Sequence, residues 1–143
     1  MSGITEELKQ EILSQKDFNQ ESIKEHYDEV AEKYDEIYLS LGYHDHEHCS
    51  KLAEKLVPQE KRAGYKVFDM GCGTGLVGEE MQKVGFDSIE GCDASPGILK
   101  VAEKKNDGKA YIKVFELWLG SPETFPEHLR GQFDMVTATG ILA

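Results

Sequence analysis

The 143-residue sequence has few basic residues and no long apolar segment. Its 16 Lys and Arg stand against 27 Asp and Glu, which gives a net charge of -11. A domain this acidic repels a phosphate backbone, so we expect no nucleic-acid partner. No run approaches the roughly 20 apolar residues that span a bilayer, and the polar, acidic N-terminus is unlike a secretory signal or a transit peptide. We therefore expect no membrane partner and a cytoplasmic protein, with the nucleus as an alternative compartment.

Cysteine is also scarce. Cys49, Cys72 and Cys92 are widely spaced and form no CxxC pair, which argues against a disulfide framework and against a structural zinc site. The run His44–Cys49 contains three histidines, but it lacks the His-Glu-x-x-His order of zinc hydrolases. We interpret this run as the hydrated start of a helix and expect no metal site.

The overall composition is that of one globular domain, with 39% apolar and 30% charged residues. Only two of the 14 glycines lie before Arg62, so the two parts of the chain differ in character. We expect a tail or short helix over residues 1–24 and one domain over residues 25–143. Within that domain, residues 25–62 form a helical cover and residues 63–143 form a core of strands, turns and short helices.

The spacing of apolar residues predicts the elements of this domain. Apolar positions at three- and four-residue spacing predict helices over residues 21–41 and 45–56. Short β-prone runs predict strands over 65–70, 88–93, 110–117 and 133–138. Helices over 75–84 and 96–105, the latter with Ser95 as N-cap, separate the first three strands. This alternation predicts an α/β fold with a doubly wound, Rossmann-like parallel sheet.

The main chemical signal is a glycine-rich loop between the first strand and the next helix, spanning Gly71–Gly75. Glycine allows sharp turns and leaves no Cβ between the chain and a ligand, and a helix N-terminus offers free N–H groups. Asp93 follows Gly71 by 22 residues, at the end of the second strand, where an acid can accept hydrogen bonds from both ribose hydroxyls. Together they predict a nucleoside cofactor across the carboxyl ends of the first two strands.

Asp69 bears on which cofactor is bound. Residues 73–78 fit the dinucleotide spacing GxGxxG, but a fingerprint that begins where the strand ends, at Gly71, would place Leu76 at its third glycine. Asp69 lies two residues before Gly71 and directs a negative charge toward the place of a pyrophosphate, which is unfavourable. The same charge attracts an ammonium or sulfonium group. An NAD-dependent oxidoreductase stays an alternative, against which Asp69 argues.

Four segments resemble a known family. Residues 67–75, VFDMGCGTG, and residues 90–99, EGCDASPGIL, resemble motifs I and II of class I S-adenosylmethionine (SAM)-dependent methyltransferases. YDEVAEKYD at residues 27–35 resembles the helix before the core in small-molecule members, and FDMVTATGIL at 133–142 resembles the strand-four motif. The resemblance covers residues 25–143 and is nearest to the Williams–Beuren-region methyltransferase-like proteins. It implies SAM as cofactor and a small-molecule methyl acceptor.

The resemblance also implies roles for individual residues. Asp69 would reach the methionine amino group through water or a backbone partner, and Asp93 would hold the ribose hydroxyls. Tyr34, with Tyr38, would cover the site from the N-terminal helix, the alternative being that this stripe packs in the core. The remaining residues would line the cofactor: Gly71, Cys72 and Gly73, with Gly75 closing the loop, at the methionine and ribose, Ala94 and Ser95 at the adenine, and Thr137 and Ala138 at the methionine end.

Two features depart from the family pattern. Many members place an acid just after strand three to bind the adenine amino group, but Glu116 is too early for this, so a backbone carbonyl near Leu119 is expected to serve. The family's sheet has seven strands, whereas the present sequence ends after the fourth predicted strand. We therefore expect a fragment, a truncated product or a chain completed by a partner. Its strand-four edge would favour self-association, and its methyl transfer would be weak or absent.

The sequence thus predicts a SAM-dependent methyltransferase that acts on a small molecule. It identifies no general base. Cys72 has no evident adjacent base that would activate it as a nucleophile, so we interpret it as a small lining residue. The alternative in another class is a non-catalytic, methyltransferase-like binding or scaffolding protein, because the predicted acceptor pocket is incomplete.

Overall fold

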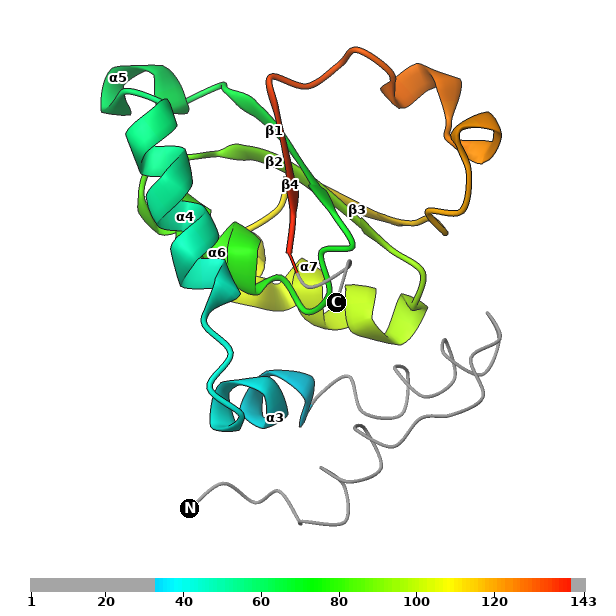
Figure 1. Cartoon of the computed structure of the whole chain (residues 1–143), viewed down its shortest axis with the longest axis horizontal. Helices are drawn as coiled ribbons and strands as arrows, with labels where there is room; N and C mark the ends of the chain where they lie inside the picture. The colour runs from blue at the N-terminus through cyan, green and yellow to red at the C-terminus, as the bar shows by residue number, and fades with distance from the viewer. Residues whose placement is uncertain (1–32, 140–143) are drawn as a thin grey trace.

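The computed structural model of the chain describes residues 33–139, in which four parallel strands form one sheet (Figure 1). The strands are β1 (Lys66–Met70), β2 (Ser88–Asp93), β3 (Lys113–Glu116) and β4 (Met135–Ala138). Their order is β3-β2-β1-β4, and every neighbouring pair is parallel. The chain therefore winds outward from β1 in both directions, which confirms the predicted doubly wound α/β fold.

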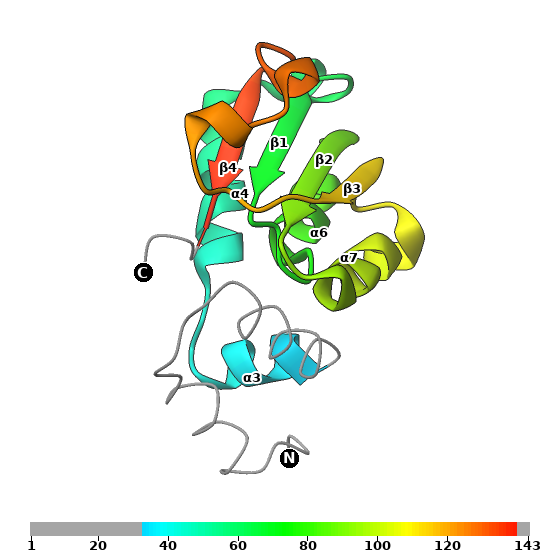
Figure 2. The same cartoon turned by 90° about the vertical axis from the view of Figure 1, so that its right-hand side faces the viewer.

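Helices cover one face of this sheet. The described helices are α3 (Tyr34–Ser40), α4 (Asp45–Leu56), α5 (Gln59–Arg62), α6 (Leu76–Lys83) and α7 (Pro96–Gly108). Figure 2 shows α4 and α6 behind the sheet, and α7 packs with them in one hydrophobic cluster. Both figures show α3 beyond the carboxyl ends of the strands. Two 3-10 turns, Pro122–Thr124 and Glu127–Leu129, lie on the opposite face. The carboxyl ends of the strands therefore point toward α3.

Successive side chains of β1 enter two separate hydrophobic clusters. Val67 joins the larger cluster, together with residues of α4, α6 and α7. Phe68 points to the other face, where it stacks on Phe115 and Phe133 and meets Phe125 edge-on. Because side chains alternate along a strand, the residue after Phe68 returns to the helix side. Both faces of the central strand are thus buried, as its apolar sequence indicates.

Most predicted elements are confirmed, and α4 and β2 have the predicted bounds. The prediction for the third strand is wrong at its start, because β3 begins at Lys113 and Tyr111 instead turns its ring into the helix-side cluster. β4 begins at Met135, two residues later than predicted. The helix expected over residues 21–41 is described only in its last turns, as α3. The tail expected over residues 1–24 lies outside the described residues.

Helix α7 begins at a side-chain cap and ends at a break in its backbone. At its start, the Ser95 hydroxyl accepts a hydrogen bond from the amide of Ile98 at 3.2 Å, which confirms the predicted N-cap. At its end, the regular helix breaks at Lys105, whose ψ is 131°, as predicted for this boundary. Asn106 and Asp107 follow with φ of 52° and 56°, a region that these two residue types tolerate better than most. The break changes the direction in which the last residues of α7 extend.

Arg62 joins the helix ends on the side of the sheet opposite to the glycine loop. Its guanidinium donates to the carbonyl of Val57 at 3.0 Å, of Val84 at 2.8 Å and of Glu54 at 3.2 Å. The same group lies 5.8 Å from the centre of the Phe86 ring. The last carbonyls of a helix lack intrahelical partners, and one side chain here satisfies carbonyls at the ends of both α4 and α6.

Candidate functional site

Three glycines set the path of the loop between β1 and α6. Gly71, Gly73 and Gly75 have φ of 63°, 57° and 95°, a region that is open to glycine at little cost. The amide of Cys72 donates to the carbonyl of Cys92 at 2.8 Å, which fastens the loop to the end of β2. Since α6 begins directly after Gly75, the amides of its first turn lie at the carboxyl end of the sheet.

Asp93 anchors this loop from the end of β2. Its Oδ2 accepts a hydrogen bond from the amide of Gly73 at 3.0 Å, and its Oδ1 accepts one from the amide of Ser95 at 3.1 Å. Burial raises the pKa of Asp93 above its ordinary value, while these backbone hydrogen bonds lower it. A carboxylate has about four lone-pair sites, so both oxygens keep acceptor capacity after anchoring the backbone. An oriented carboxylate beside an open glycine backbone fits a ribose with two hydroxyl donors.

Asp69 lies at the end of β1 and is only 1% exposed. Its Oδ2 accepts a hydrogen bond from the Tyr111 hydroxyl at 2.6 Å, and its Oδ1 accepts one from the Thr137 hydroxyl at 2.8 Å. Burial raises the pKa of Asp69 to about 6, although both hydrogen bonds lower it. The carboxylate therefore has internal partners on both oxygens. The role of Asp69 toward a methionine amino group, through water or a backbone partner, stays a prediction.

Tyr111 is a site residue that the sequence patterns did not identify. Its buried hydroxyl accepts a hydrogen bond from the amide of Gly78 at 3.1 Å while it donates to Asp69. A Cβ at Gly75, Gly78 or Gly91 would lie 2.9, 2.3 or 2.9 Å from the Tyr111 ring. Three glycines from different elements thus make room for one aromatic side chain beneath the loop. Its hydrogen-bond partners are 33 and 42 residues away in sequence, and no local pattern carries that signal.

The other predicted cofactor residues differ in exposure. Cys72 is 7% exposed, and burial, with the nearby charges of Asp69 and Asp93, raises the pKa of its thiol well above the ordinary value. This disfavours a thiolate nucleophile, and the lining role of Cys72 stays a prediction. Ser95 is fully buried as the cap of α7, and Ala94 beside it is half-buried. The adenine contacts of both residues stay predictions.

The remaining predicted site residues lie at the end of β3, in the segment that follows it, and in α3. Leu119 is 38% exposed in the segment that follows β3. Glu116 ends β3 in register with Asp93, and the expectation that a backbone carbonyl near Leu119 serves in place of an acid stays a prediction. Tyr34 and Tyr38 belong to α3, but their side chains lie outside what the structure describes. Their covering role stays a prediction, and α3 itself lies beyond the strand ends, where such a cover is expected (Figure 2).

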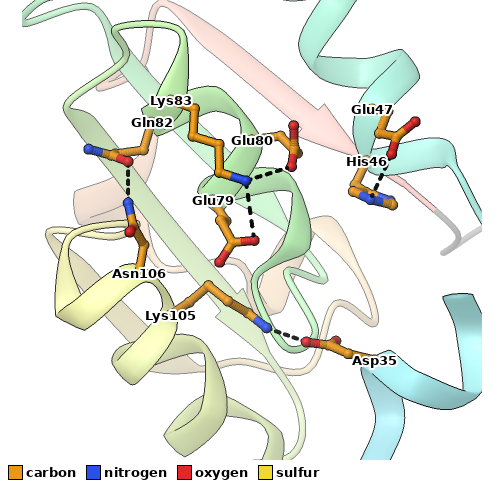
Figure 3. Close-up of polar contacts among 9 residues, drawn as sticks. All are labelled: Asp35, His46, Glu47, Glu79, Glu80, Gln82, Lys83, Lys105 and Asn106. Carbon is orange, nitrogen blue, oxygen red and sulfur yellow. Dashed lines mark hydrogen bonds and ion pairs between the residues drawn. The ribbon is translucent and has the colours of Figure 1, made fainter. Parts of the chain in front are cut away.

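The first turn of α4 holds a buried imidazole. His46 is 4% exposed and stacks on Tyr43 with ring centres 5.9 Å apart. Its Nε2 lies 3.8 Å from a carboxylate oxygen of Glu47 (Figure 3), and its Nδ1 has no hydrogen-bond partner within the described part of the chain. The interpretation of residues 44–49 as a hydrated helix start is therefore wrong for His46, because this face of α4 is turned inward.

Two other kinds of site are not found within residues 33–139. In that range no three His, Cys, Asp or Glu side chains gather in a way that could hold a metal ion. None of the helices in the same range combines the length and the apolar character needed to cross a membrane.

Comparison with known proteins gives a consistent family. The ubiE/COQ5 methyltransferase family matches residues 15–141. The chain is 31% identical over 118 residues to methyltransferase-like protein 27 of Homo sapiens, a match that covers 82% of this chain and 45% of that protein. It is 36% identical over 88 residues to a demethylmenaquinone methyltransferase of Chlorobaculum parvum, covering 59% of this chain and 36% of that protein.

A solved structure shows the same arrangement. SAM-bound CalS10, an amino pentose methyltransferase from Micromonospora echinaspora involved in calicheamicin biosynthesis, superposes with a TM-score of 0.51 at 27% identity. The superposition covers 73% of this chain and 40% of the CalS10 chain. The chain thus spans less than half the length of the relatives that it matches.

Proposed function

This chain belongs to the ubiE/COQ5 methyltransferase family, and on that premise we propose that it transfers a methyl group from SAM to a small-molecule acceptor. Its class is that of the class I SAM-dependent methyltransferases, whose cofactor is SAM. The observation that carries the proposal is the bond between Asp93 and the amide of Gly73. This hydrogen bond joins Asp93, the proposed ribose-binding residue, to the glycine loop, so that one ligand can contact both.

Bound SAM supplies an electrophilic methyl group on a sulfonium. The residues of the chain bind and orient this group. Asp93 accepts hydrogen bonds from the ribose hydroxyls, and the loop from Gly71 to Gly75 brings its backbone close to the methionine and ribose. Asp69 contributes negative charge from below the loop, which favours a cationic ligand over a pyrophosphate. Catalysis of methyl transfer then depends on alignment of the acceptor and exclusion of water.

The acceptor is a small molecule in this proposal. The net charge of -11 disfavours nucleic acid and favours a small neutral or cationic compound. The names of two similar proteins, a demethylmenaquinone methyltransferase and an amino pentose methyltransferase, also refer to small acceptors. The general base stays unassigned.

Two alternatives make different predictions. A methyltransferase-like binding protein would take up SAM without transferring its methyl group. An NAD-dependent oxidoreductase would use residues 73–78 as a dinucleotide fingerprint. Against the latter, Gly78 serves here to admit the ring of Tyr111, and the carboxyl group of Asp69 lies buried beneath the loop.

Calorimetry with SAM and with NAD on the same preparation tests the proposal. We expect SAM to bind and NAD to bind more weakly or not at all. Tighter binding of NAD would overturn the methyltransferase assignment. A panel of small hydroxyl and amine acceptors, followed by release of S-adenosylhomocysteine, then separates an enzyme from a protein that only binds SAM.

A further inference from the structure

The carboxylate of Asp35, in the first turn of α3, has two partners that are distant in sequence. Its Oδ1 accepts a hydrogen bond from the hydroxyl of Thr74, in the glycine loop. Its Oδ2 forms an ion pair with the ammonium of Lys105, at the break in α7 (Figure 3). One side chain of the N-terminal helix therefore contacts both the loop that binds the cofactor and the helix that follows β2.

These contacts are shielded from water. Thr74 is 2% exposed, and the side chains of Lys105 and Asp35 are 13% and 22% exposed. Shielded charges are screened less by salt than exposed charges are, and removal of one partner leaves the other unpaired in a poorly solvated place. The pair of Lys83 with Glu80 on α6 provides a contrast, because its lysine side chain is 55% exposed and such pairs contribute little.

The break in α7 places Lys105 for this contact. The next residue, Asn106, has a positive φ and donates its side-chain amide to Gln82 of α6. Two adjacent residues of α7 thus reach two different helices, α6 and α3 (Figure 3). The hydrogen bond between Asn106 and Gln82 fastens the end of α7 to α6. It thereby helps to position the neighbouring Lys105 for its ion pair with Asp35 of α3.

The glycine loop is consequently held from two sides. Asp93 holds the amide of Gly73 from β2, and Asp35 holds the hydroxyl of Thr74, the next residue, from α3. We propose that Asp35 is a positioning residue that couples docking of α3 to the cofactor-binding shape of the glycine loop. This inference rests on the proposed function, because its ligand is SAM or the product S-adenosylhomocysteine. If docked α3 favours binding, bound ligand must favour docked α3 by the same factor.

Ligand affinity is the first test. Calorimetry with S-adenosylhomocysteine on the full 143-residue chain compares wild type with Asp35→Asn, Lys105→Met and Thr74→Val. We expect roughly tenfold weaker binding in Asp35→Asn, within the usual range of coupling between sites, and a smaller loss in the other two variants. Lys83→Met is the matched control, since it removes the same charge from an exposed pair on α6, and it should bind like wild type.

Hydrogen exchange of the α3 amides, residues 34–40, is the second test. In wild type, S-adenosylhomocysteine should slow their exchange several-fold, whereas in Asp35→Asn exchange should be faster and should respond little to ligand. A residue that only stabilises the fold would lower the melting temperature without removing this ligand response. Thermal unfolding of each variant shows whether it is folded, and Thr74→Val replaces Asp35→Asn if the latter is not.

The outcomes separate this inference from the proposed function. If wild type binds neither SAM nor S-adenosylhomocysteine, the proposed function fails, and faster α3 exchange in ligand-free Asp35→Asn would still support the fastening of α3. If wild type binds while Asp35→Asn and Lys105→Met match its affinity within twofold, the coupling is overturned. Unchanged ligand protection of α3 in Asp35→Asn would overturn it as well.

Discussion

The hydroxyl of Tyr111 donates a hydrogen bond to Asp69 across 2.6 Å and accepts one from the amide of Gly78. One phenol thereby joins the last residues of β1 to the first turn of α6. It satisfies a buried carboxylate and a helix amide that has no intrahelical partner. The two elements on either side of the glycine loop are thus tied together beneath it, and the shape of the loop depends on this contact.

Removal of that hydroxyl should destabilise the protein. We expect Tyr111→Phe to lower the free energy of unfolding by about 1–3 kcal/mol, because it leaves Asp69 and the amide of Gly78 each with one hydrogen bond fewer. Urea unfolding measures the difference. Tyr65→Phe is the control, since the half-buried ring of Tyr65 packs edge-on against Phe86 and should keep that contact. Equal stability of the two variants would contradict the role of Tyr111.

A methyl group at Gly78 should have the opposite effect to that usual in a helix. Gly to Ala in a helix ordinarily stabilises by roughly 0.5–1 kcal/mol. At Gly78 a Cβ would lie 2.3 Å from the Tyr111 ring, so we expect a loss of about 1–3 kcal/mol from overpacking. The double variant Gly78→Ala with Tyr111→Leu should show a favourable coupling energy in a double-mutant cycle. Purely additive losses would show that the ring is not the obstacle.

Stability should depend on pH through Asp69. Burial raises the pKa of Asp69 from 3.8 to about 6, so between these values the folded state binds more protons than the unfolded state. The contribution of Asp69 to the free energy of unfolding is therefore full below about pH 4, falls as the pH rises to about 6 and is constant above that.

Asp69→Asn has no such titration. The stability of wild type relative to this variant should drop by about 2 kcal/mol between pH 4 and pH 7. Urea unfolding at several pH values gives the difference in free energy of unfolding between the two proteins. The other acidic residues are the same in both, so their contributions cancel in this difference. A relative stability that rises with pH would mean that the pKa of Asp69 is lowered by folding.

Asp93 should carry much of the cofactor affinity. Asp93→Ala removes two acceptors for charge-assisted hydrogen bonds from ribose, which we expect to cost about 2–3 kcal/mol of SAM binding. Asp93→Asn keeps one acceptor oxygen, so its affinity for SAM should lie between that of wild type and that of Asp93→Ala. Asp87→Ala is the control and should bind SAM like wild type. Asp87 likewise accepts a hydrogen bond from a backbone amide, that of Gly64, but it lies at the far end of β2. Unchanged SAM affinity in Asp93→Ala would disprove the ribose contact.

The edge of the described sheet should mediate self-association. β4 is the last strand in the order, and Val136 is 57% exposed there. Open strand edges with apolar residues favour pairing between chains. We expect the apparent mass in light scattering to rise with concentration and Val136→Lys to suppress the rise. Leu52→Lys, at an equally exposed position on α4, should leave it unchanged. A monomer at all concentrations would contradict the prediction.

Local signals account for the parts of the fold that the sequence predicted. The glycine loop, the cap at Ser95 and the alternating strands each depend on neighbours within a few residues. Their positions were therefore readable without a structure, and Asp93 could be placed beside the loop because parallel strands bring their carboxyl ends together. Asp69 and Thr137 were also expected at the site, but not the hydrogen bonds that Thr137 and Tyr111 donate to Asp69.

What the sequence did not predict depends on contacts between distant segments. Tyr111 looked like part of a strand, and only the three-dimensional arrangement shows that Gly75, Gly78 and Gly91 make room for it. Asp35 and Lys105 likewise form an ion pair although they are 70 residues apart in sequence, and no local pattern indicates that contact. His46 was misread for the same reason, since its burial depends on which face of α4 the rest of the chain covers.

The three carbonyl contacts of Arg62 join the C-terminal ends of α4 and α6. These ends lie on the far side of the sheet from the glycine loop, which has hydrogen bonds of its own to Asp93 and Asp35. The packing of the helical layer and the shape of the loop therefore depend on separate sets of hydrogen bonds. Loss of the Arg62 contacts would weaken the first set without removing any member of the second.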